Sequence, residues 1–445
     1  MELFGTDGIR ARAGEFPLNA AAIPAIGQAI GEKLGGAVLV GEDTRVSSPW
    51  ILNLLIAGIL QSGVSTVEMA GVIPTPAIAL LTRSYSFAGG IMISASHNPF
   101  EDNGIKVFSG DGTKLTEDVE AEIERRILEL LSSGAEAGTD QIADADRLLN
   151  RETAWTERYQ QLLLSHFPKG KWLSEIQVIA DCANGAMSGI APAVLKTLGA
   201  DVRVICASPD GRNINADCGA VHMSALASAM KDETADFGVA FDGDGDRSLF
   251  VSRSGKLVDG DAVMLVMVRT IRPLAVVGTS MTNYAFEKMM EGEGIGLTRV
   301  AVGDRYVFEE MQRSGATLGG EPSGHIIFSD FGLSGDGLLT TLKVAQAIVE
   351  TGQSLDELTR DWVPAPQLLK GARVSRKIPL EEMSTLQAAM RDANTVLDGC
   401  GRLVVRYSGT EPLLRVMIES DDANRNDMWM KKLLAAIDED MKNRG

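Results

Sequence analysis

Three aspartates, Asp242, Asp244 and Asp246, alternate with glycines and run directly into Arg247. Three like charges on one short loop are unfavourable unless a cation gathers them, and oxygen ligands suit a hard divalent ion such as Mg²⁺. The apolar run 235–241 before them predicts a buried strand. In open α/β sheets ligands bind where such strands end. The loop therefore predicts a metal-assisted reaction on an anion, with a phosphate ester as the first choice.

Other interpretations of this loop remain open from the loop alone. Asp-Gly pairs favour turns, so the run could be a solvated acidic loop. A calcium-binding EF-hand fits poorly, because Arg247 and Arg253 stand where that loop needs its glycine and its bidentate glutamate. The other polar loops of the chain must decide between a metal site and a solvated turn.

A second polar loop, 93–99, reads Ile-Ser-Ala-Ser-His-Asn-Pro and follows a predicted strand. Two serines, His97 and the later Lys106 fit a nucleophilic or phospho-acceptor serine with cationic and acid-base neighbours. The same residue types also favour plain turns. From this segment alone, a catalytic serine and a structural turn are equally well supported.

Two further loops could bind a phosphosugar. In 320–325, Glu321 and Ser323 suit the hydroxyls of a sugar and His325 could transfer a proton, although a structural turn explains the loop as well. The segment 406–412 and the later Arg415 favour an anion cradle over a surface hairpin, because hydroxyls, backbone N–H groups and arginines gather there on an acidic chain. The cradle comprises Arg406, Ser408, Gly409, Thr410 and Arg415. Segments 41–45 and 303–306 could contact substrate, or cap helices and pair charges between domains.

Composition limits the classes of function. The net charge is −18, from 42 basic and 60 acidic residues, which argues against nucleic-acid partners and anionic membranes. The N-terminus lacks the pattern of a signal peptide, and the apolar stretch 50–60 is too short to span a bilayer. The four cysteines are scattered, which predicts free thiols in a reducing cytoplasm and no zinc site. Nucleotide-binding glycine motifs and the hydrolase serine elbow are absent from the sequence.

The elements that position these loops follow from the apolar pattern. Strand-like runs alternate with helical ones along most of the chain, which predicts α/β architecture with buried strands. We expect three similar α/β domains with mixed, largely parallel sheets and a small C-terminal α+β domain. The polar stretch 132–146 is expected to connect the first two. The predicted domains are 1–150, 151–254, 255–365 and 366–445.

Five motifs occur in the order found in the α-D-phosphohexomutases: 4–10, 94–99, 242–247, 320–325 and 408–412. The chain therefore resembles that superfamily nearly from end to end. Segments 110–115, 213–219 and 302–307 are most similar to its glucosamine branch. Pro322 is more familiar from the glucose and mannose branch, and Tyr407 stands where proline is frequent.

The resemblance implies four domains around a central cleft, each giving one loop. It makes Ser96 a phosphoserine whose oxygen joins Asp242, Asp244 and Asp246 around one Mg²⁺. It implies that Glu321 and Ser323 bind the hydroxyls of the sugar. It also implies that the 406–415 cradle binds the phosphate that does not react. The implied cationic and acid-base groups near the reacting phosphoryl group are Arg10, His97, Lys106, Arg247 and His325.

The expected reaction interconverts glucosamine 6-phosphate and glucosamine 1-phosphate through glucosamine 1,6-bisphosphate, which serves as intermediate or activator. A glucose or mannose phosphomutase is the alternative within the family. A Mg²⁺-dependent phosphatase and a non-catalytic sugar-phosphate binder are the alternatives from other classes. We expect a phosphosugar as the small-molecule partner, activation of Ser96 by a kinase or by autophosphorylation, and a homodimer as one option for assembly.

Overall fold

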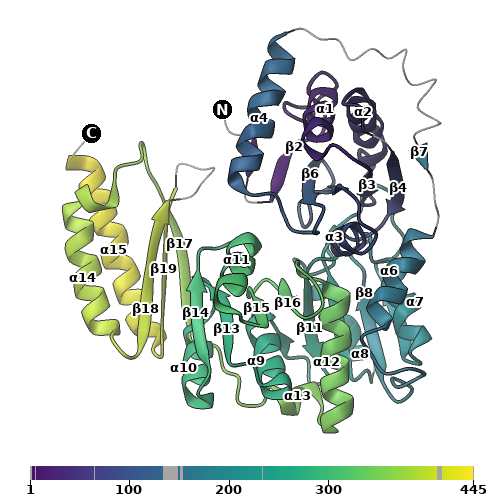
Figure 1. Ribbon diagram of the computed structural model, residues 1–445. Helices are drawn as coiled ribbons and strands as arrows, with labels where there is room; N and C mark the ends of the chain where they lie inside the picture. The colour runs from purple at the N-terminus through teal and green to yellow at the C-terminus, as the bar shows by residue number, and fades with distance from the viewer. Residues whose placement is uncertain are drawn as a thin grey trace. The chain divides into compact units, whose positions relative to one another are not determined.

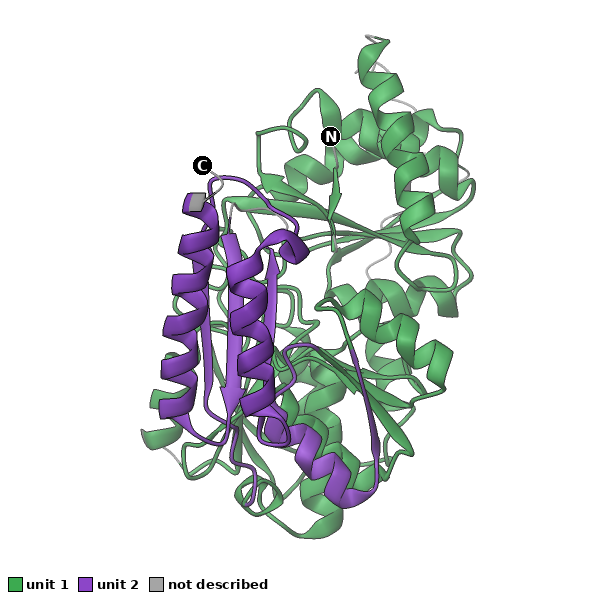
Figure 2. Cartoon of the chain, turned by 90° about the vertical axis from the view of Figure 1, so that its left-hand side faces the viewer, with its two compact units in different colours: residues 1–279, 300–360 green, residues 280–299, 361–445 purple. Residues whose placement is uncertain are grey.

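The computed structural model describes residues 3–5, 7–64, 66–133, 149–150, 154–232, 234–407 and 413–443. The chain forms two compact units, shown in different colours in Figure 2: residues 1–279 with 300–360, and residues 280–299 with 361–445. The stretch 134–148, which includes most of the predicted connection, lies outside the described residues. Within the described part, none of the helices combines the length and apolar character needed to cross a membrane.

The first sheet of the larger unit has seven strands in the order β1-β2-β6-β5-β3-β4-β7. These strands are β1 (Phe4–Gly5), β2 (Gly8–Arg12), β3 (Val38–Glu42), β4 (Val67–Val72), β5 (Gly89–Ile93), β6 (Asp102–Ser109) and β7 (Leu149–Asn150). Its helices are α1 (Ala22–Leu34), α2 (Ser48–Gln61), α3 (Thr75–Ser84) and α4 (Glu117–Ser132). Apolar side chains of α1, α2 and α4 share one core with the sheet, and Figure 1 shows these three helices together, apart from α3.

The second sheet has five strands in the order β12-β11-β10-β8-β9. They are β8 (Gln177–Asp181), β9 (Asp201–Ile205), β10 (Phe237–Phe241), β11 (Ser248–Ser252) and β12 (Leu257–Val258), accompanied by helices α6 (Trp155–Leu164), α7 (Ile190–Thr197) and α8 (Ser224–Asp232). Strand β8 pairs in parallel with β9 and β10. Strand β10 is buried along its whole length, as its apolar sequence predicts, and pairs antiparallel with β11.

The third α/β layer contains β13 (Ala275–Thr279), β15 (Leu318–Gly320) and β16 (Ile326–Phe328). Strand β13 is parallel to β15, and β15 forms an antiparallel hairpin with β16. The accompanying helices are α9 (Gly260–Ile271), α11 (Asp304–Ser314), α12 (Gly337–Thr351) and α13 (Leu355–Leu358). Asp336 caps α12, because its Oδ1 accepts hydrogen bonds from the N–H groups of Leu338 and Leu339.

The smaller unit is built on an antiparallel sheet in the order β17-β19-β18. Its elements are α10 (Tyr284–Glu293), β14 (Gly296–Val300), β17 (Gln367–Arg373), the 3₁₀ helix η2 (Leu380–Glu382), α14 (Ser384–Leu397), β18 (Gly401–Tyr407), β19 (Leu413–Ser420) and α15 (Ala423–Asn443). Apolar residues of α14 and α15 form one core with the sheet, and Figure 2 shows both helices along one face of the strands. Arg402 ties the segment before α10 to this sheet by donating to the carbonyl oxygen of Ser280 at 2.8 Å.

The predicted fold class is confirmed: three α/β domains with mixed sheets precede a small C-terminal α+β domain. Antiparallel pairs arise for a physical reason. A short polar loop joins β5 to β6, β10 to β11 and β15 to β16, and strands joined so closely can only run in opposite directions. Each of these three loops carries residues that were predicted to be functional.

Candidate active site

Ser96 lies in the short loop between β5 and β6 and is buried, with 1% of its surface exposed. Its φ of 51° is in the left-handed region, which non-glycine residues adopt rarely. The N–H of Ser96 donates to Ser94 Oγ at 2.9 Å. Its Oγ donates to Asp242 Oδ2 at 2.6 Å. The structure therefore brings together the serine and the aspartate loop, which are 146 residues apart.

A buried arginine holds this serine loop by its backbone. Arg45 Nη2 donates to the carbonyl oxygens of Ser96 and Asn98, both at 2.8 Å, and Nη1 donates to that of Asp102 at 2.9 Å. Arg45 Nε pairs with Asp43 Oδ2 at 2.8 Å. The segment 41–45 was predicted to contact substrate, or to cap helices and pair charges between domains. Its Arg45 fixes the loop that carries Ser96, within the first domain.

The aspartate loop joins β10 to β11 and reaches the serine loop by its backbone. A Cβ atom on Gly243 would lie 2.6 Å from the carbonyl oxygen of Ser96, so only glycine allows this approach. Asp242, Asp244 and Asp246 are buried, and one oxygen of each lies within 4.8 Å of the others. The Oδ1 atoms of Asp244 and Asp246 have no hydrogen-bond partner among the described residues.

Buried carboxylate oxygens without donors are costly, and a bound cation would satisfy them. The three aspartates therefore fit a divalent metal ion, and the hardness of their oxygen ligands fits Mg²⁺. Burial raises the pKa of Asp242, and the charges of Asp246 and Asp244 raise it further. Without a cation, one of these acids is thus driven towards its neutral form.

Lys106 supplies positive charge to the same carboxylates. Its Nζ lies 2.8 Å from Asp244 Oδ2, 3.4 Å from Asp246 Oδ2 and 2.9 Å from Asp7 Oδ2. Burial alone would lower the pKa of Lys106, but these three carboxylates outweigh it and raise the pKa. Lys106 therefore stays protonated at neutral pH.

His325 follows the β15–β16 turn and faces carboxylates on both sides. Its Nδ1 lies 3.7 Å from Asp246 Oδ2, and its Nε2 lies 3.5 Å from Asp304 Oδ2. The N–H of Gly335 donates to Nε2 at 2.9 Å, so in the neutral ring the proton sits on Nδ1, towards Asp246. Burial alone would lower the pKa of His325, but Asp246 and Asp304 raise it.

Three charged residues of this network were not predicted from the sequence as site residues. Lys114 Nζ lies 2.5 Å from Asp7 Oδ1 and 2.6 Å from Asp304 Oδ2. Asp7 also pairs with Arg10. Asp304 begins α11 and falls in the segment 303–306, which was predicted to contact substrate, or to cap helices and pair charges between domains. Asp304 pairs with Lys114, which precedes α4 in the first domain.

The remaining predicted cationic and acid-base groups lie beside the serine. His97 Nδ1 is 3.3 Å from Ser96 Oγ. Burial lowers the pKa of His97 to about 4, assisted by the charges of Arg247 and Arg10. The N–H of Arg247 donates to Asp242 Oδ1 at 3.1 Å, while its Nε, 3.9 Å from Asp246 Oδ1, has no hydrogen-bond partner among the described residues.

Glu321 and Ser323 lie in the hairpin loop before His325. The N–H of Glu321 donates to the carbonyl oxygen of His325 at 3.0 Å, and Glu321 Oε1 accepts from the N–H of Gly303 at 3.1 Å. Within the described part of the chain, the buried Ser323 Oγ has no partner. This hydroxyl therefore has a hydrogen-bonding capacity that the described residues do not use, and its predicted role in sugar binding stays a prediction.

The predicted cradle belongs to the smaller unit. Arg406 on β18 and Arg415 on β19 are directly opposite each other across the antiparallel ladder. Residues 408–410, the predicted hydroxyl and N–H donors Ser408, Gly409 and Thr410, lie outside the described residues.

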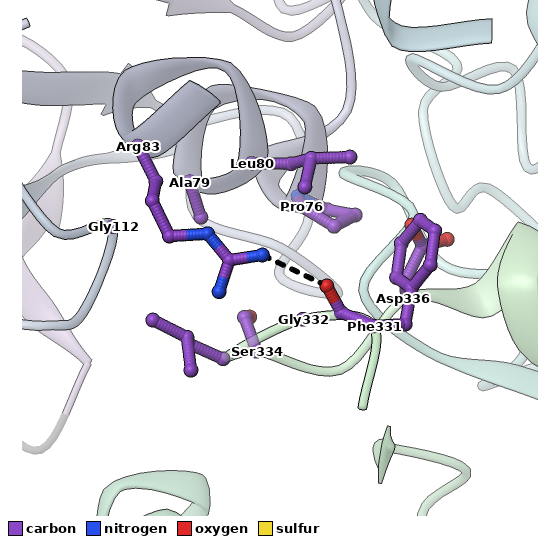
Figure 3. A pocket seen from close by; sticks show the side chains of 10 residues that line it. Pro76, Ala79, Leu80, Arg83, Gly112, Phe331, Gly332, Ser334 and Asp336 are labelled. Atoms are coloured by element: carbon purple, nitrogen blue, oxygen red, sulfur yellow. Dashed lines mark hydrogen bonds between the residues drawn. The ribbon is translucent and has the colours of Figure 1, made fainter. Parts of the chain in front are cut away.

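A small pocket lies beside this network, between α3 and the segment 331–336 (Figure 3). Its cavity volume is about 10 Å³, so it holds about one water molecule and no sugar. Arg83 crosses it and donates to the carbonyl oxygen of Phe331 at 3.0 Å. Arg83 thus anchors the segment that carries Gly335, whose N–H donates to His325.

Comparison with known proteins agrees with this architecture. Family models described as phosphoglucomutase/phosphomannomutase match four successive parts of the chain: alpha/beta/alpha domain I at residues 1–133, domain II at 157–255, domain III at 259–365 and the C-terminal domain at 369–436. The chain therefore belongs to the phosphoglucomutase/phosphomannomutase family, which confirms the resemblance seen in its motifs. Its fold and site define it as a phosphohexomutase, an isomerase.

Within this family, the chain is similar over nearly its whole length to proteins named phosphoglucosamine mutase. The protein from Solibacter usitatus (strain Ellin6076) is 42% identical and covers 99% of both chains. The protein from Deinococcus deserti is 44% identical and covers 94% of both chains.

Solved structures share the fold at lower identity. A phosphoglucomutase/phosphomannomutase family protein from Burkholderia thailandensis superimposes with a TM-score of 0.79 at 22% identity, over 98% of this chain and 97% of that one. An N-acetylphosphoglucosamine mutase from Aspergillus fumigatus, solved in complex with GlcNAc-6P and magnesium, gives a TM-score of 0.66 at 17% identity, over 99% of this chain and 96% of that one.

Proposed function

We propose that this phosphohexomutase interconverts glucosamine 6-phosphate and glucosamine 1-phosphate, with Ser96 carrying the phosphoryl group in the active enzyme. The observation that carries the proposal is the hydrogen bond of 2.6 Å from Ser96 Oγ to Asp242 Oδ2. It places a buried serine hydroxyl directly against a cluster of carboxylates that fits a divalent cation. The choice of sugar is supported by the relatives named phosphoglucosamine mutase.

The reaction proceeds in two phosphoryl transfers. Phosphorylated Ser96 gives its phosphoryl group to the C1 hydroxyl of glucosamine 6-phosphate: the Ser96 O–P bond breaks, a P–O1 bond forms, the C1 hydroxyl loses its proton and Ser96 Oγ gains one. The product, glucosamine 1,6-bisphosphate, turns end for end. Ser96 Oγ then takes the phosphoryl group from O6, which regains a proton, and glucosamine 1-phosphate leaves. Such transfers depend mainly on positioning and on neutralising charge.

Asp242, Asp244, Asp246 and an oxygen of phosphorylated Ser96 would hold one Mg²⁺, which when bound supplies charge neutralisation to the phosphoryl group. Lys106 and Arg247 act in the same sense, because both stay protonated at neutral pH.

His97 has a different part in the chemistry. Because its pKa is lowered to about 4, its ring is neutral at neutral pH. Its Nδ1 is 3.3 Å from Ser96 Oγ. We assign to His97 the proton that Ser96 loses when it takes back the phosphoryl group.

Each unit carries its own proposed substrate-binding residues. In the larger one, Glu321 and Ser323 would bind the sugar hydroxyls, which is supported by the Ser323 Oγ that has no hydrogen-bond partner among the described residues. In the smaller one, Arg406 and Arg415 with residues 408–410 would hold the phosphate that does not react. The opposed positions of the two arginines on neighbouring strands support this assignment.

We also retain the domain limits 1–150, 151–254, 255–365 and 366–445 as part of the proposal. The family-model matches, which end at residues 133, 255, 365 and 436, support them. A cytoplasmic location, supported by the four free cysteines, and activation of Ser96 by a kinase or by autophosphorylation complete the proposal.

Replacing Ser96 tests the phosphoserine. Ser96→Ala should abolish mutase activity and remove the fraction of protein that is heavier by one phosphoryl group in intact-mass measurement. Ser165→Ala, which changes an exposed hydroxyl on the same unit, should retain both. Normal turnover by Ser96→Ala would overturn the assignment. Release of inorganic phosphate by that variant would instead indicate the phosphatase alternative.

The sugar preference needs a separate experiment. The Mg²⁺-loaded protein should be assayed with the 6-phosphates of glucosamine, glucose and mannose, and the values of kcat/KM compared. We expect glucosamine 6-phosphate to give the highest value. A higher value for glucose or mannose would assign the chain to the other branch of the family and leave the phosphoserine mechanism intact.

A further inference from the structure

A second group of metal-ligating side chains lies outside the site described above. Asp181 ends strand β8, Cys206 follows strand β9, and Cys218 comes from the loop that precedes α8. Strands β8 and β9 are parallel, with Asp181 opposite Ile205, so their ends meet at one edge of the sheet. One ligand atom from each of the three side chains lies within 4.8 Å of the others.

The carboxylate of Asp181 is held by the surrounding backbone. Asp181 Oδ1 accepts from the N–H of Ala183 and Oδ2 accepts from the N–H of Gly219, both at 2.9 Å. Because each carboxylate oxygen has two lone pairs, both oxygens can still bind a cation. Hydrogen bonds of this kind orient the ligands of metal sites. Cys218 is buried and Cys206 is partly exposed, so the cluster has a route to solvent through Cys206.

We propose that Asp181, Cys206 and Cys218 form a binding site for a thiophilic divalent cation, of which Zn²⁺ is the representative. Two sulfurs and one carboxylate oxygen are a ligand set that zinc accepts, with water as the fourth ligand. Binding forms two metal–sulfur bonds and one metal–oxygen bond and releases the two thiol protons to solvent. The site is separate from the all-oxygen aspartate cluster, which suits a hard cation.

The proposed cation site of Asp181, Cys206 and Cys218 is connected to the serine loop through a short segment. The loop that carries Cys218 also carries Asn215, whose Nδ2 donates to the carbonyl oxygens of Ser96 at 2.9 Å and Asn98 at 3.2 Å. The N–H of Asn215 donates in turn to the carbonyl oxygen of Ala183, two residues after Asp181, at 2.9 Å. Asn215 thus lies between the two ligands: Cys218 is three residues after it, and its N–H is bonded to Ala183, close behind Asp181 in the chain. A cation bound to Asp181 and Cys218 would therefore hold Asn215 in place against the serine loop.

Cobalt is the probe for this site, because Co²⁺ replaces Zn²⁺ and its thiolate bonds give a sulfur-to-cobalt charge-transfer band in the near ultraviolet. The full chain, reduced, freed of metal and then saturated with Mg²⁺, should be titrated with Co²⁺. We expect about one Co²⁺ per chain with the thiolate band, and loss of the band when Zn²⁺ is added. Absence of the band in the native protein would overturn the proposal.

Four variants locate the site. Cys206→Ser should lose the band, and because Cys206 is partly exposed this change leaves the core intact. Asp181→Asn should weaken Co²⁺ binding by at least about tenfold. The band should persist in two controls. Cys400→Ser changes a thiol in the smaller unit, and Asp244→Asn changes the aspartate cluster. A band of native intensity in Cys206→Ser, or one that disappears in Cys400→Ser, would contradict the assignment. None of these outcomes depends on the identity of the sugar or on phosphorylation of Ser96.

Discussion

The guanidinium group of Arg45 donates a hydrogen bond of 2.8 Å to the backbone carbonyl oxygen of Ser96. The arginine is buried, with 1% of its surface exposed, and Asp43 balances its charge. Asp43 Oδ2 also accepts from Ser94 Oγ at 2.7 Å, and Ser94 Oγ accepts from the N–H of Ser96. The left-handed conformation of Ser96 is therefore fixed on its N–H side and on its carbonyl side by one connected set of polar groups.

Arg45→Lys should impair catalysis without changing substrate affinity. One ammonium group cannot span the carbonyl oxygens that the guanidinium fork reaches, so buried acceptors lose their donors. We expect the free energy of unfolding to fall by about 2–4 kcal/mol and kcat to fall roughly tenfold to hundredfold, with KM little changed.

The control for this variant is Arg83→Lys, because Arg83 also donates to a loop carbonyl but acts on Phe331. It should lose some stability and keep a higher kcat than Arg45→Lys. If the two variants had equal kcat values, the contacts of Arg45 would be structural only.

Mg²⁺ bound by the aspartate cluster should raise the Tm of the protein, and this rise can be measured without an activity assay. Asp244→Asn removes a ligand charge, so Mg²⁺ should bind at least about tenfold more weakly. The rise in Tm caused by Mg²⁺ should shrink accordingly, because ligand binding to the folded state sets that rise. Asp201→Asn changes an exposed acid and should leave the rise intact. An undiminished Mg²⁺ effect in Asp244→Asn would place the metal elsewhere.

Removal of Lys114 should destabilise the charged form of Asp304 more than that of Asp7. Asp7 keeps Lys106 and Arg10 as partners when Lys114 is removed. Asp304 then faces His325 alone among the cations paired with it in the described part of the chain. Lys114→Met should therefore cost about 3 kcal/mol, measured by urea unfolding, and should raise the pKa of His325 followed by NMR.

A double variant tests this reasoning. Lys114→Met with Asp304→Asn should be less destabilised than the sum of the single variants, by about 1–3 kcal/mol. Simple additivity would show that the two residues do not interact. Lys33→Met, which breaks an exposed pair with Glu122, should cost less than about 1 kcal/mol.

Asp336 predicts a pH dependence of stability. Burial raises its pKa from 3.8 to about 6. The folded state thus binds the proton more tightly than the unfolded state, so this stabilisation is complete below about pH 4 and is lost as the pH rises through about 6.

Asp336→Asn removes that dependence and keeps an oxygen for the N–H groups of Leu338 and Leu339. Relative to the native protein, the variant should gain up to about 3 kcal/mol between pH 4 and pH 6, measured by chemical unfolding at each pH. A stability difference that stays constant across this range would contradict the raised pKa.

Much of the site could be predicted from local sequence because its loops are short and follow strands. The aspartates, Ser96 and His325 lie in compact polar motifs, and each motif falls where an apolar run ends. The strands themselves were predicted closely: the run 176–180 became β8, and the run 401–405 became β18, extended to Tyr407.

The supporting charges could not be predicted in the same way. Lys114 and Asp304 are 190 residues apart, and nothing in their local sequence shows that they meet. Arg45 lies in a polar turn whose sequence is compatible with capping, with pairing or with binding, and only the folded chain shows that it reads backbone carbonyls. The scattered cysteines likewise gave no sign that two of them converge on Asp181.

The contacts of Arg45 limit which sequence changes the serine loop can tolerate. Because the guanidinium contacts the serine loop through carbonyl oxygens and not through side chains, these contacts do not depend on the side chain of a residue such as Asn98. They are sensitive to spacing, since the contacted carbonyls of Ser96, Asn98 and Asp102 must keep their separations along the chain. The loop should therefore tolerate a side-chain change at Asn98 better than an insertion or deletion between Ser96 and Asp102, so that its length is more strictly preserved than its composition.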